Sequence, residues 1–217
     1  MTYTAKVDLI GVSPYTQSFQ HNTPKLPKEL ADAYEERTWR NKVHRNDEGL
    51  VVMPAMGFKN AIAEAAKYLS IQIPGKGKST YTKHFESGIL VQEDPIIYLR
   101  DGNDYKPIHV DNVPRMAMNV PSDGVSGSGK RVQKFFPVFA MGWKATVNYL
   151  VMDDVISHEV FLDTLVQAGQ LIGIGSFRVR NKGTFGRFRV AGMEWNEYEA
   201  KKDNIRLVIN GKEVKVA

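Results

Sequence analysis

The 217-residue sequence contains no cysteine. This absence excludes disulfide bonds, thiolate metal ligands and a cysteine nucleophile. The sequence also lacks any apolar run approaching the roughly 18 residues that indicate a membrane span, so no membrane role is expected. The first residues show no basic segment followed by an apolar stretch, and export by a signal peptide is therefore not expected. A cytoplasmic location fits these absences.

Acidic residues are missing from four separate basic segments, although the net charge is only +5. These segments carry just over half of the 29 lysines and arginines, and the rest of the chain is acidic overall. They are Arg37–Arg45, Lys76–Lys83, Lys130–Lys134 and Arg178–Arg189. Concentrated basic segments on an acidic body indicate binding of a polyanion. The alternative is that each segment is a solvated loop.

Helix and strand patterns alternate along the chain. Residues 4–12 and 185–195 show strand patterns, and apolar residues recur at helical spacing after Pro54. A second helix is expected from Ser157, whose side chain can cap its start, to Gly173, which suits a helix end. Further strands are expected at 89–91, 96–99, 108–110, 132–139 and 143–151.

The order of these elements predicts an α+β fold. Without insertions it reads strand, helix, strands, helix, strand, which is the ferredoxin-like β-α-β-β-α-β core that RNA-recognition modules also use. Two polar segments, at about 13–49 and 70–88, are too long for routine connections and are expected to be functional insertions. Asn210-Gly211 between apolar runs predicts a C-terminal β-hairpin over 205–216. With no repeat and no clear linker, residues 1–217 are expected to form one domain.

The segment Gly173–Val190 follows the second expected helix and combines three useful residue types. Glycines permit positive φ values and close approach of the backbone to a ligand, cations contact phosphates, and aromatic rings stack on bases. This combination predicts binding of single-stranded nucleic acid, either RNA or single-stranded DNA, without strong sequence preference. The candidate contacts in the segment are Arg178, Arg180, Lys182, Arg187, Arg189, Phe177, Gly175 and Gly183.

The same segment does not fit the common nucleotide-binding motifs. Gly173-x-Gly175 precedes no helix, so the dinucleotide-binding fingerprint fails, and no Gly-Lys-Ser/Thr follows at the spacing of a phosphate-binding loop. One alternative stays open: a glycine-rich turn into an edge strand, in which Phe185 and Phe188 only pack.

Two motifs resemble a known family. Gly173-Ile174-Gly175, followed by a basic stretch and Gly183-Thr184-Phe185-Gly186, resembles the glycine-rich loop of the RAMP superfamily, the repeat-associated mysterious proteins of CRISPR systems. Met53–Ala61 is similar to the Pro-x-x-x-hydrophobic-Lys-x-Ala/Gly helix start of Cas7-type backbone subunits. The chain as a whole is also similar to phage-encoded proteins associated with this group.

The resemblance implies a Cas7-like palm whose two insertions contact neighbouring subunits and nucleic acid. It further implies self-association into a filament or ring, or a place in a RAMP-type complex, in the host cytoplasm if the protein is phage-encoded. The cations of Gly173–Val190 then neutralise phosphates. The remaining basic segments extend this track through Arg37, Arg40, Lys42, Lys76, Lys78, Lys83, Lys130 and Arg131.

There is little support for catalysis in the sequence, and no cofactor or metal is expected. The five histidines lack metal-ligand spacing, and adjacent carboxylates such as Asp153-Asp154 are typical of turns. His84, near Tyr81 in a basic loop, is the only candidate general base, and it keeps a metal-independent endoribonuclease as one alternative. Another alternative is a phage structural or assembly protein whose basic loops meet acidic protein surfaces.

Overall fold

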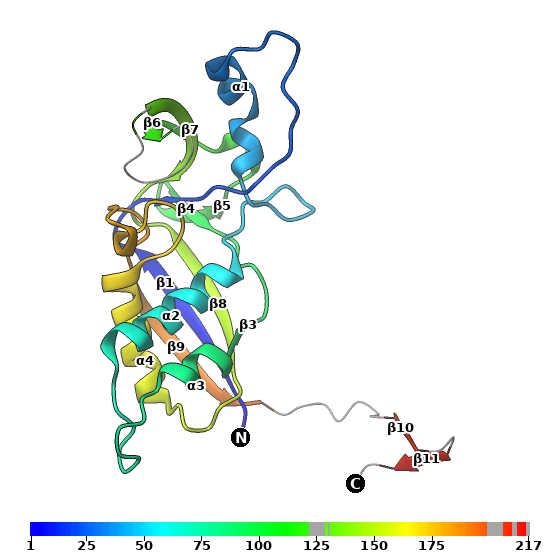
Figure 1. Cartoon of the computed structure of the whole chain (residues 1–217), viewed down its shortest axis with the longest axis vertical. Coiled ribbons are helices and arrows are strands. Elements are labelled where there is room, and N and C mark those ends of the chain that lie inside the picture. The colour runs from blue at the N-terminus through cyan, green and yellow to red at the C-terminus, as the bar shows by residue number, and fades with distance from the viewer. Residues whose placement is uncertain (122–128, 130, 199–205, 210–211, 216–217) are drawn as a thin grey trace.

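A computed structural model describes residues 1–121, 129, 131–198, 206–209 and 212–215, with side chains described up to residue 198. Its main feature is a six-stranded antiparallel sheet with the strand order β5-β4-β8-β1-β9, in which β3 also pairs with β8. Figure 1 shows this sheet running through the lower part of the molecule. The strands are β1 Tyr3–Gly11, β3 Ile89–Val91, β4 Tyr98–Asp101, β5 Asp104–Pro107, β8 Lys144–Val151 and β9 Phe188–Glu197.

Three helices cover one face of this sheet (Figure 1): α2 Ala55–Leu69, α3 Thr82–Ser87 and α4 His158–Gln167. Strand β1 buries Val7 and its alternate neighbours beneath them and exposes Lys6 and Asp8 on the other face, which matches the alternation in the sequence. Ser157 caps α4 through a hydrogen bond from the backbone N–H of Val160 to its hydroxyl, as expected. A π-helical turn, Ala168–Ile172, extends α4 to Gly173.

Four strands of the main sheet, β1, β3, β8 and β9, are connected through the two long helices. Helix α2 lies in sequence between β1 and β3, and α4 lies between β8 and β9, while the spatial order is β3-β8-β1-β9. Each neighbouring pair in this set is antiparallel. The result is a mixed α/β architecture with antiparallel sheets, in which both long helices cover the same side.

A second, three-stranded sheet stands above the first and has the order β2-β7-β6, with β2 Tyr15–Thr16, β6 Arg115–Pro121 and β7 Arg131–Phe139. The strand expected at 132–139 therefore exists but lies outside the main sheet. A third sheet pairs β10 Arg206–Ile209 with β11 Lys212–Lys215, and this antiparallel pair agrees with the expected C-terminal hairpin. The turn residues Asn210-Gly211 lie outside the described residues.

Three local expectations were wrong at the level of boundaries. The strand expected at 96–99 is β4, which begins two residues later, and the segment expected to be a strand at 108–110 leads instead into a 3₁₀ turn, Val110–Asn112. The last strand of the main sheet begins at Phe188 rather than at residue 185, because residues 173–187 form a closed loop.

Residues 17–45 form an arm that follows β2 of the second sheet and leads back toward α2 (Figure 1). The arm contains α1 Ala31–Thr38 and the 3₁₀ turn Trp39–Lys42, which pack on β7. Trp39 is buried there. The arm lies within the range 13–49 that was expected to be the first insertion. No helix in the described part of the chain is both long enough and apolar enough to cross a membrane.

Trp143 joins the two sheets at the end of β1. Its indole is fully buried, packs at a tilt against the Tyr15 ring with centroids 5.9 Å apart, and donates a hydrogen bond of 3.1 Å to the carbonyl of Ser13. Gly11 lies directly on this indole, so that a Cβ atom at position 11 would stand 2.1 Å from Nε1 of Trp143. The crossing from the first sheet to the second therefore requires glycine at this position.

We predict that Gly11→Ala lowers the free energy of unfolding by about 1–3 kcal/mol, because the added methyl group overpacks the indole. Urea denaturation followed by tryptophan fluorescence measures the change. Gly57→Ala is the matched control: a Cβ atom there meets nothing within 4 Å, and alanine suits the interior of α2. Equal stability of the Gly11→Ala variant and the wild type would contradict this account of the crossing.

Candidate nucleic-acid interface

The segment Gly173–Arg187, called the glycine loop below, is closed by its own backbone. The N–H of Ile174 donates to the carbonyl of Gly186 over 3.0 Å, and the N–H of Gly183 donates to the carbonyl of Arg178 over 3.1 Å. Gly186 has a φ of 75°, in the left-handed region that favours glycine. These contacts explain why the loop is compact although its only helical element is the short 3₁₀ turn Val179–Asn181.

The glycines approach protein atoms rather than open space. A Cβ atom at Gly183 would lie 1.7 Å from the carbonyl oxygen of Phe177, and one at Gly175 would lie 2.2 Å from the carbonyl oxygen of Thr16. The expected positive φ is present at Gly175, with a value of 78°. The close approach that the sequence suggested for a ligand is thus made by the chain itself, so these two glycines shape the loop.

The aromatic residues of the loop also contact each other and the neighbouring sheet. The ring of Phe177 meets Phe136 of β7 edge-on, with centroids 5.0 Å apart, and lies 6.5 Å from the ring of Phe185. Phe188 is buried against Phe58 of α2. Phe177 keeps part of its ring accessible, whereas Phe188 has no face free for a base.

Two of the five cations in this region share one carboxylate. Arg178 and Arg180 both donate to Glu64 of α2, over 3.1 and 2.9 Å. Arg187 donates through Nε to the backbone carbonyl of Gln170. Lys182 and Arg189 are exposed, and neither makes an ion pair with a described residue.

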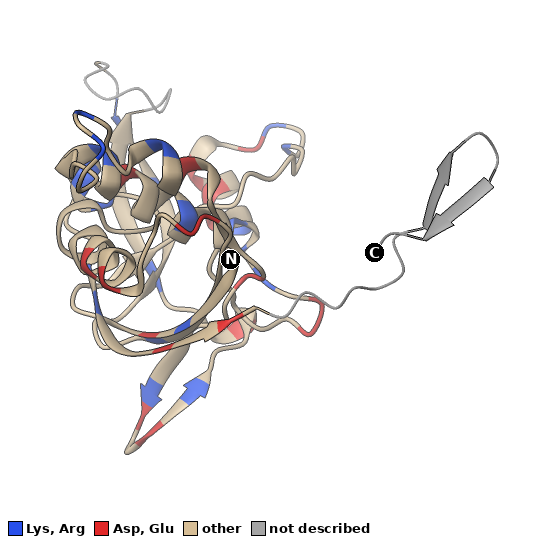
Figure 2. Ribbon diagram, turned by 90° about the horizontal axis from the view of Figure 1, so that it is seen from below, with Lys and Arg blue, Asp and Glu red and all other residues tan. Residues whose placement is uncertain are grey.

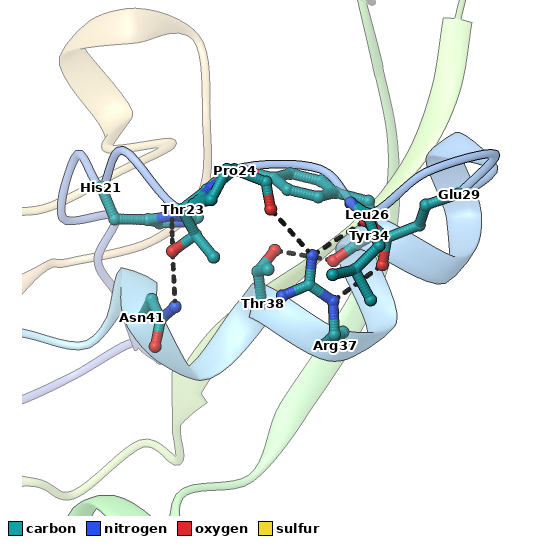
Figure 3. Close-up of polar contacts among 9 residues, drawn as sticks. All are labelled: His21, Thr23, Pro24, Leu26, Glu29, Tyr34, Arg37, Thr38 and Asn41. Atoms are coloured by element: carbon teal, nitrogen blue, oxygen red, sulfur yellow. Dashed lines mark hydrogen bonds and ion pairs between the residues drawn. The ribbon is translucent and has the colours of Figure 1, made fainter.

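The cations of the arm are used in three different ways. Arg37 makes a two-pronged ion pair with Glu29, over 2.7 and 2.8 Å, which Figure 3 shows beside Tyr34. Lys42 is only 8% exposed, and its ammonium donates to Glu35 and to the carbonyl of Phe135. Arg40 lies over the ring of Trp39, 4.6 Å from its centroid, and is exposed.

Burial changes the interpretation of Lys42. This residue was expected to contact nucleic acid, but its charge is satisfied inside the protein, where it holds the arm to β7. Its ammonium donates to Glu35 and to the carbonyl of Phe135, so a phosphate at this position competes with these two partners. Lys42 holds the arm to β7 in this fold, and its place in a basic segment gave no sign of this contact.

The other candidate cations lie in two regions. Arg131 is exposed at the start of β7 and donates to the carbonyl of Asn119, while Lys130 lies outside the described residues. Lys76 and Lys78 are exposed in the loop between α2 and α3, and Lys83 is exposed in α3. In Figure 1 this loop descends to the lower end of the molecule, away from α1 and the β6–β7 hairpin.

Three of the four basic segments therefore converge, and one does not. The glycine loop contacts β7 through Phe177, and the arm contacts the same strand through Lys42. The segment at 76–83 is the separate one. Figure 2 adds that, along the ribbon of the described residues, lysines and arginines are interspersed with acidic residues.

A small cavity of about 180 Å³ brings together the two motifs that carry the family resemblance. Met53, Pro54, Gly57 and Phe58 at the start of α2 line one side, and Ile174, Gly175 and Ser176 of the glycine loop line another. His44 of the arm completes the wall, and its burial lowers the pKa of its imidazole. The ring is thus neutral near pH 7 and can both donate and accept hydrogen bonds.

His44, Arg45 and Phe19 were not among the residues expected at the site. Arg45 is exposed without an ion pair to a described residue, and the exposed ring of Phe19 meets His44 edge-on at 5.1 Å. Arg45 is the last residue of the basic segment Arg37–Arg45, and this charge pattern was the only feature of the sequence that pointed to Arg45 as a site residue. Phe19 and His44 come together only through the fold of the arm.

His84 has a defined partner. Its Nδ1 lies 2.6 Å from Oδ2 of Asp153, in the turn after β8, and the hydrogen bond lowers the pKa of this carboxyl group although partial burial opposes the shift. Gly88 packs on the same aspartate. The pair attaches α3 to the end of β8, and His84 retains its second ring nitrogen at a partly exposed position. No group of three or more histidine or acidic side chains in the described residues is placed to hold a metal ion.

Comparisons with known proteins identify the fold. No family model matches the sequence, and the search of curated proteins gave no match. Among solved structures, the chain is similar to a chain of the Type III-B Cmr-beta complex bound to cognate target RNA, with a TM-score of 0.52 and 10% identity. The similarity covers 90% of this chain and 61% of the Cmr-beta chain, so this chain spans less than two thirds of that chain's length.

A second similar structure is Cmr6 from Pyrococcus furiosus, with a TM-score of 0.47 and 12% identity over 88% of this chain and 99% of Cmr6. At 10% identity, the likeness to the Cmr-beta chain shows a shared fold and nothing more specific.

The ion pair of Glu29 with Arg37 gives a prediction about pH. Hydrogen bonds from Arg37 lower the pKa of Glu29 to about 2, and the backbone N–H of Leu26 donates to the same carboxylate over 3.0 Å. Because the folded-state pKa lies below the ordinary value of about 4.3, this pair stabilises the arm fully above that value and less as the pH falls toward 2. We expect the amide ¹H–¹⁵N signal of Leu26 to titrate with a midpoint near pH 2. Glu29→Gln should abolish this titration, and a wild-type midpoint above pH 4 would show that the pair does not form in solution.

Proposed function

We propose that the chain binds single-stranded nucleic acid, RNA or single-stranded DNA, with little sequence preference, as a Cas7-like RAMP protein without enzymatic activity. The observation that carries this proposal is the meeting of the glycine loop and the start of α2 around one cavity. These segments are far apart in the sequence and are the two that resemble RAMP motifs. The fold shared with a chain of a complex bound to target RNA supports the same function.

We further propose that β1, α2, β3, β8, α4 and β9 form a ferredoxin-like core within a single domain. The spatial order β3-β8-β1-β9, with both helices on one face, supports this assignment. The arm then corresponds to the first insertion, and the loop before α3 to the second. The paired strands β6 and β7 form a third excursion from the core that the sequence did not indicate.

The proposed contact surface follows the cations that have no carboxylate partner among the described residues. In the arm, the glycine loop and the start of β9, the exposed cations of this kind that we place in the surface are Arg40, Arg45, Lys182 and Arg189. An exposed cation without a carboxylate partner breaks no ion pair when it contacts a phosphate. We therefore assign the phosphate contacts to these cations before the paired ones. Arg178 and Arg180 join them when a phosphate competes with Glu64.

Self-association, or a place in a RAMP-type complex, is part of the proposal. It is supported by the exposed apolar residues of the arm, where Leu26 and Leu30 have 56% and 76% of their surface accessible. Large apolar side chains at the tip of a protruding arm are typical of protein contacts. The alternative of a structural protein with acidic partners uses the same cations but gives no preference for single strands.

Binding at increasing salt tests the function directly. We expect labelled 20-nucleotide RNA and single-stranded DNA to bind more tightly than a duplex, and the logarithm of the association constant to fall steeply with the logarithm of the salt concentration. Glu64→Gln should raise affinity several-fold and steepen the slope by about one, since it releases Arg178 and Arg180 for phosphates. Glu194→Gln, which breaks the exposed pair with Lys6 over 3.3 Å, is the control and should change little.

Two results would overturn this proposal. The first is an absence of binding to any oligonucleotide at low salt. The second is a wild type that prefers the duplex. An unchanged slope in the Glu64→Gln variant would remove Arg178 and Arg180 from the contact surface.

One observation favours a second function. The short hydrogen bond between His84 and Asp153 orients the imidazole and leaves its other nitrogen available, as a general base for cleavage at an RNA 2′-hydroxyl requires. If the chain is an endoribonuclease, His84→Gln abolishes cleavage of RNA and leaves binding unchanged. On the first proposal the wild type leaves a labelled RNA intact, and His84→Gln lowers only thermal stability, because α3 loses its attachment to Asp153. Gel analysis of the RNA and a thermal melt separate the two.

A further inference from the structure

A hollow of about 450 Å³ lies between the arm and the segment that leads to α2, next to the cavity described above. Its size lies within the roughly 300–1,000 Å³ that is typical of small-ligand sites. It is lined by Phe19, His21, Arg40, Asn41, His44 and Arg45, together with smaller neighbours and Asp94. His44 also lines the 180 Å³ cavity, so the two spaces adjoin.

We propose that this hollow is a nucleotide site, in which one base of the bound strand stacks on Phe19 and its phosphate lies between Arg40 and Arg45. The proposal rests on the proposed function, since it names the place where one nucleotide of the strand is held.

An aromatic ring with an accessible face is already in position. Phe19 is 49% exposed, its ring meets His44 edge-on, and its backbone N–H donates to the carbonyl of Lys42 over 2.8 Å. The hydrogen bond fixes the backbone at Phe19, and the exposed half of the residue leaves ring surface accessible to a base. Base stacking on such a face contributes strongly to single-strand binding and tolerates any base.

The charges of the arm are arranged so that two arginines remain available at this place. Arg37, Lys42 and Arg115 are each paired with a glutamate: Glu29, Glu35 and Glu36, respectively. Arg40 and Arg45, which line the hollow, make no ion pair with any described residue. A phosphate is the group that matches two guanidinium groups at the edge of such a site.

Polar groups on the floor of the hollow are held in fixed positions. Thr23 Oγ1 lies 3.0 Å from Nδ1 of His21 and accepts a hydrogen bond of 2.9 Å from Nδ2 of Asn41, as Figure 3 shows. The side-chain oxygen of Asn41 and Nε2 of His21 have no hydrogen-bond partner among the described residues. Amide and imidazole groups that are held in place and still have an unused hydrogen-bonding atom can form hydrogen bonds with the edge of a base.

Asp94 determines which side takes the phosphate. Among the described residues that line the hollow it is the one acidic side chain, and its Oδ1 accepts a hydrogen bond of 2.7 Å from the backbone N–H of Ala55. Its negative charge repels a phosphate from the side of α2. The phosphate is therefore placed on the side of Arg40 and Arg45, and the strand continues past His44 toward the glycine loop.

The test uses a fluorescent 20-nucleotide oligouridylate and three variants of the full chain. Phe19→Ala should weaken binding about ten-fold or more with an unchanged salt slope, because stacking involves no counterion release. Arg40→Gln combined with Arg45→Gln should weaken binding and reduce the slope by about one. Lys25→Gln combined with Lys28→Gln removes the same charge from the same arm outside the hollow, and should leave the slope nearly unchanged. Thermal melts confirm folding of each variant.

A second measurement does not depend on the variants. An oligonucleotide carrying 5-iodouridine should cross-link on irradiation to the peptide that contains Phe19, as identified by mass spectrometry. Uridine monophosphate, added as a free nucleotide, should compete with the oligonucleotide only at concentrations far above those of unlabelled strand.

The outcomes separate the site from the function. If the wild type binds no oligonucleotide, the proposed function itself fails. If the wild type binds and all three variants bind equally well, the function stands and this site is wrong. Tight binding of uridine monophosphate that Phe19→Ala abolishes, with unchanged strand binding, would also overturn the proposal, since the hollow would then hold a free nucleotide.

Discussion

The close contact of the glycine loop with the segment at 14–16 is the constraint on which the rest of the structure depends. The N–H of Ser176 donates to the carbonyl of Thr16 over 2.9 Å, and the N–H of Gly186 donates to the carbonyl of Pro14 over 2.8 Å. No side chain larger than hydrogen fits at Gly175, which lies on Thr16 and on the Tyr15 ring. Because this segment is also the crossing between the two sheets, the same contact fixes the second sheet, and with it the arm that packs on β7.

This constraint gives the glycines of the loop a structural role that does not compete with binding. A loop that closes on itself and on its neighbour presents its cations from a fixed backbone, so less conformational entropy is lost when they meet a ligand. Glu64 adds to this order by holding Arg178 and Arg180 before any ligand arrives. The opposing effect is that a phosphate must displace a carboxylate at these two residues. The unpaired Arg40 and Arg45 carry no such penalty, which is why the arm contributes as much to the proposed surface as the loop does.

The sequence predicted the local elements well and the partners of charged residues poorly. Periodicity was enough for β1, α2 and α4, because a strand or helix with one buried face repeats at its own spacing. The separate second sheet was not predicted, since the pattern of β7 is the same whichever sheet it joins. The pairing of Arg178 with Glu64 spans 114 residues, and that of Lys42 with the Phe135 carbonyl spans 93. Contacts at such separations leave no local trace, so the basic segments did not show which of their cations are paired with carboxylates in the fold.

The position of the fourth basic segment bears on assembly. The loop that contains Lys76 and Lys78 extends toward the end of the molecule opposite α1. Within one copy, this distance makes the loop useless as an extension of the surface formed by the arm, β7 and the glycine loop. Self-association is part of the proposed function, and a head-to-tail arrangement of copies reverses that conclusion, because it brings the lower end of one copy to the upper end of the next. Lys76 and Lys78 would then lie beside the proposed contact surface of a neighbouring copy. A nucleic-acid strand that crosses several copies would contact the arm, β7 and the glycine loop of one copy and then the segment 76–83 of the next.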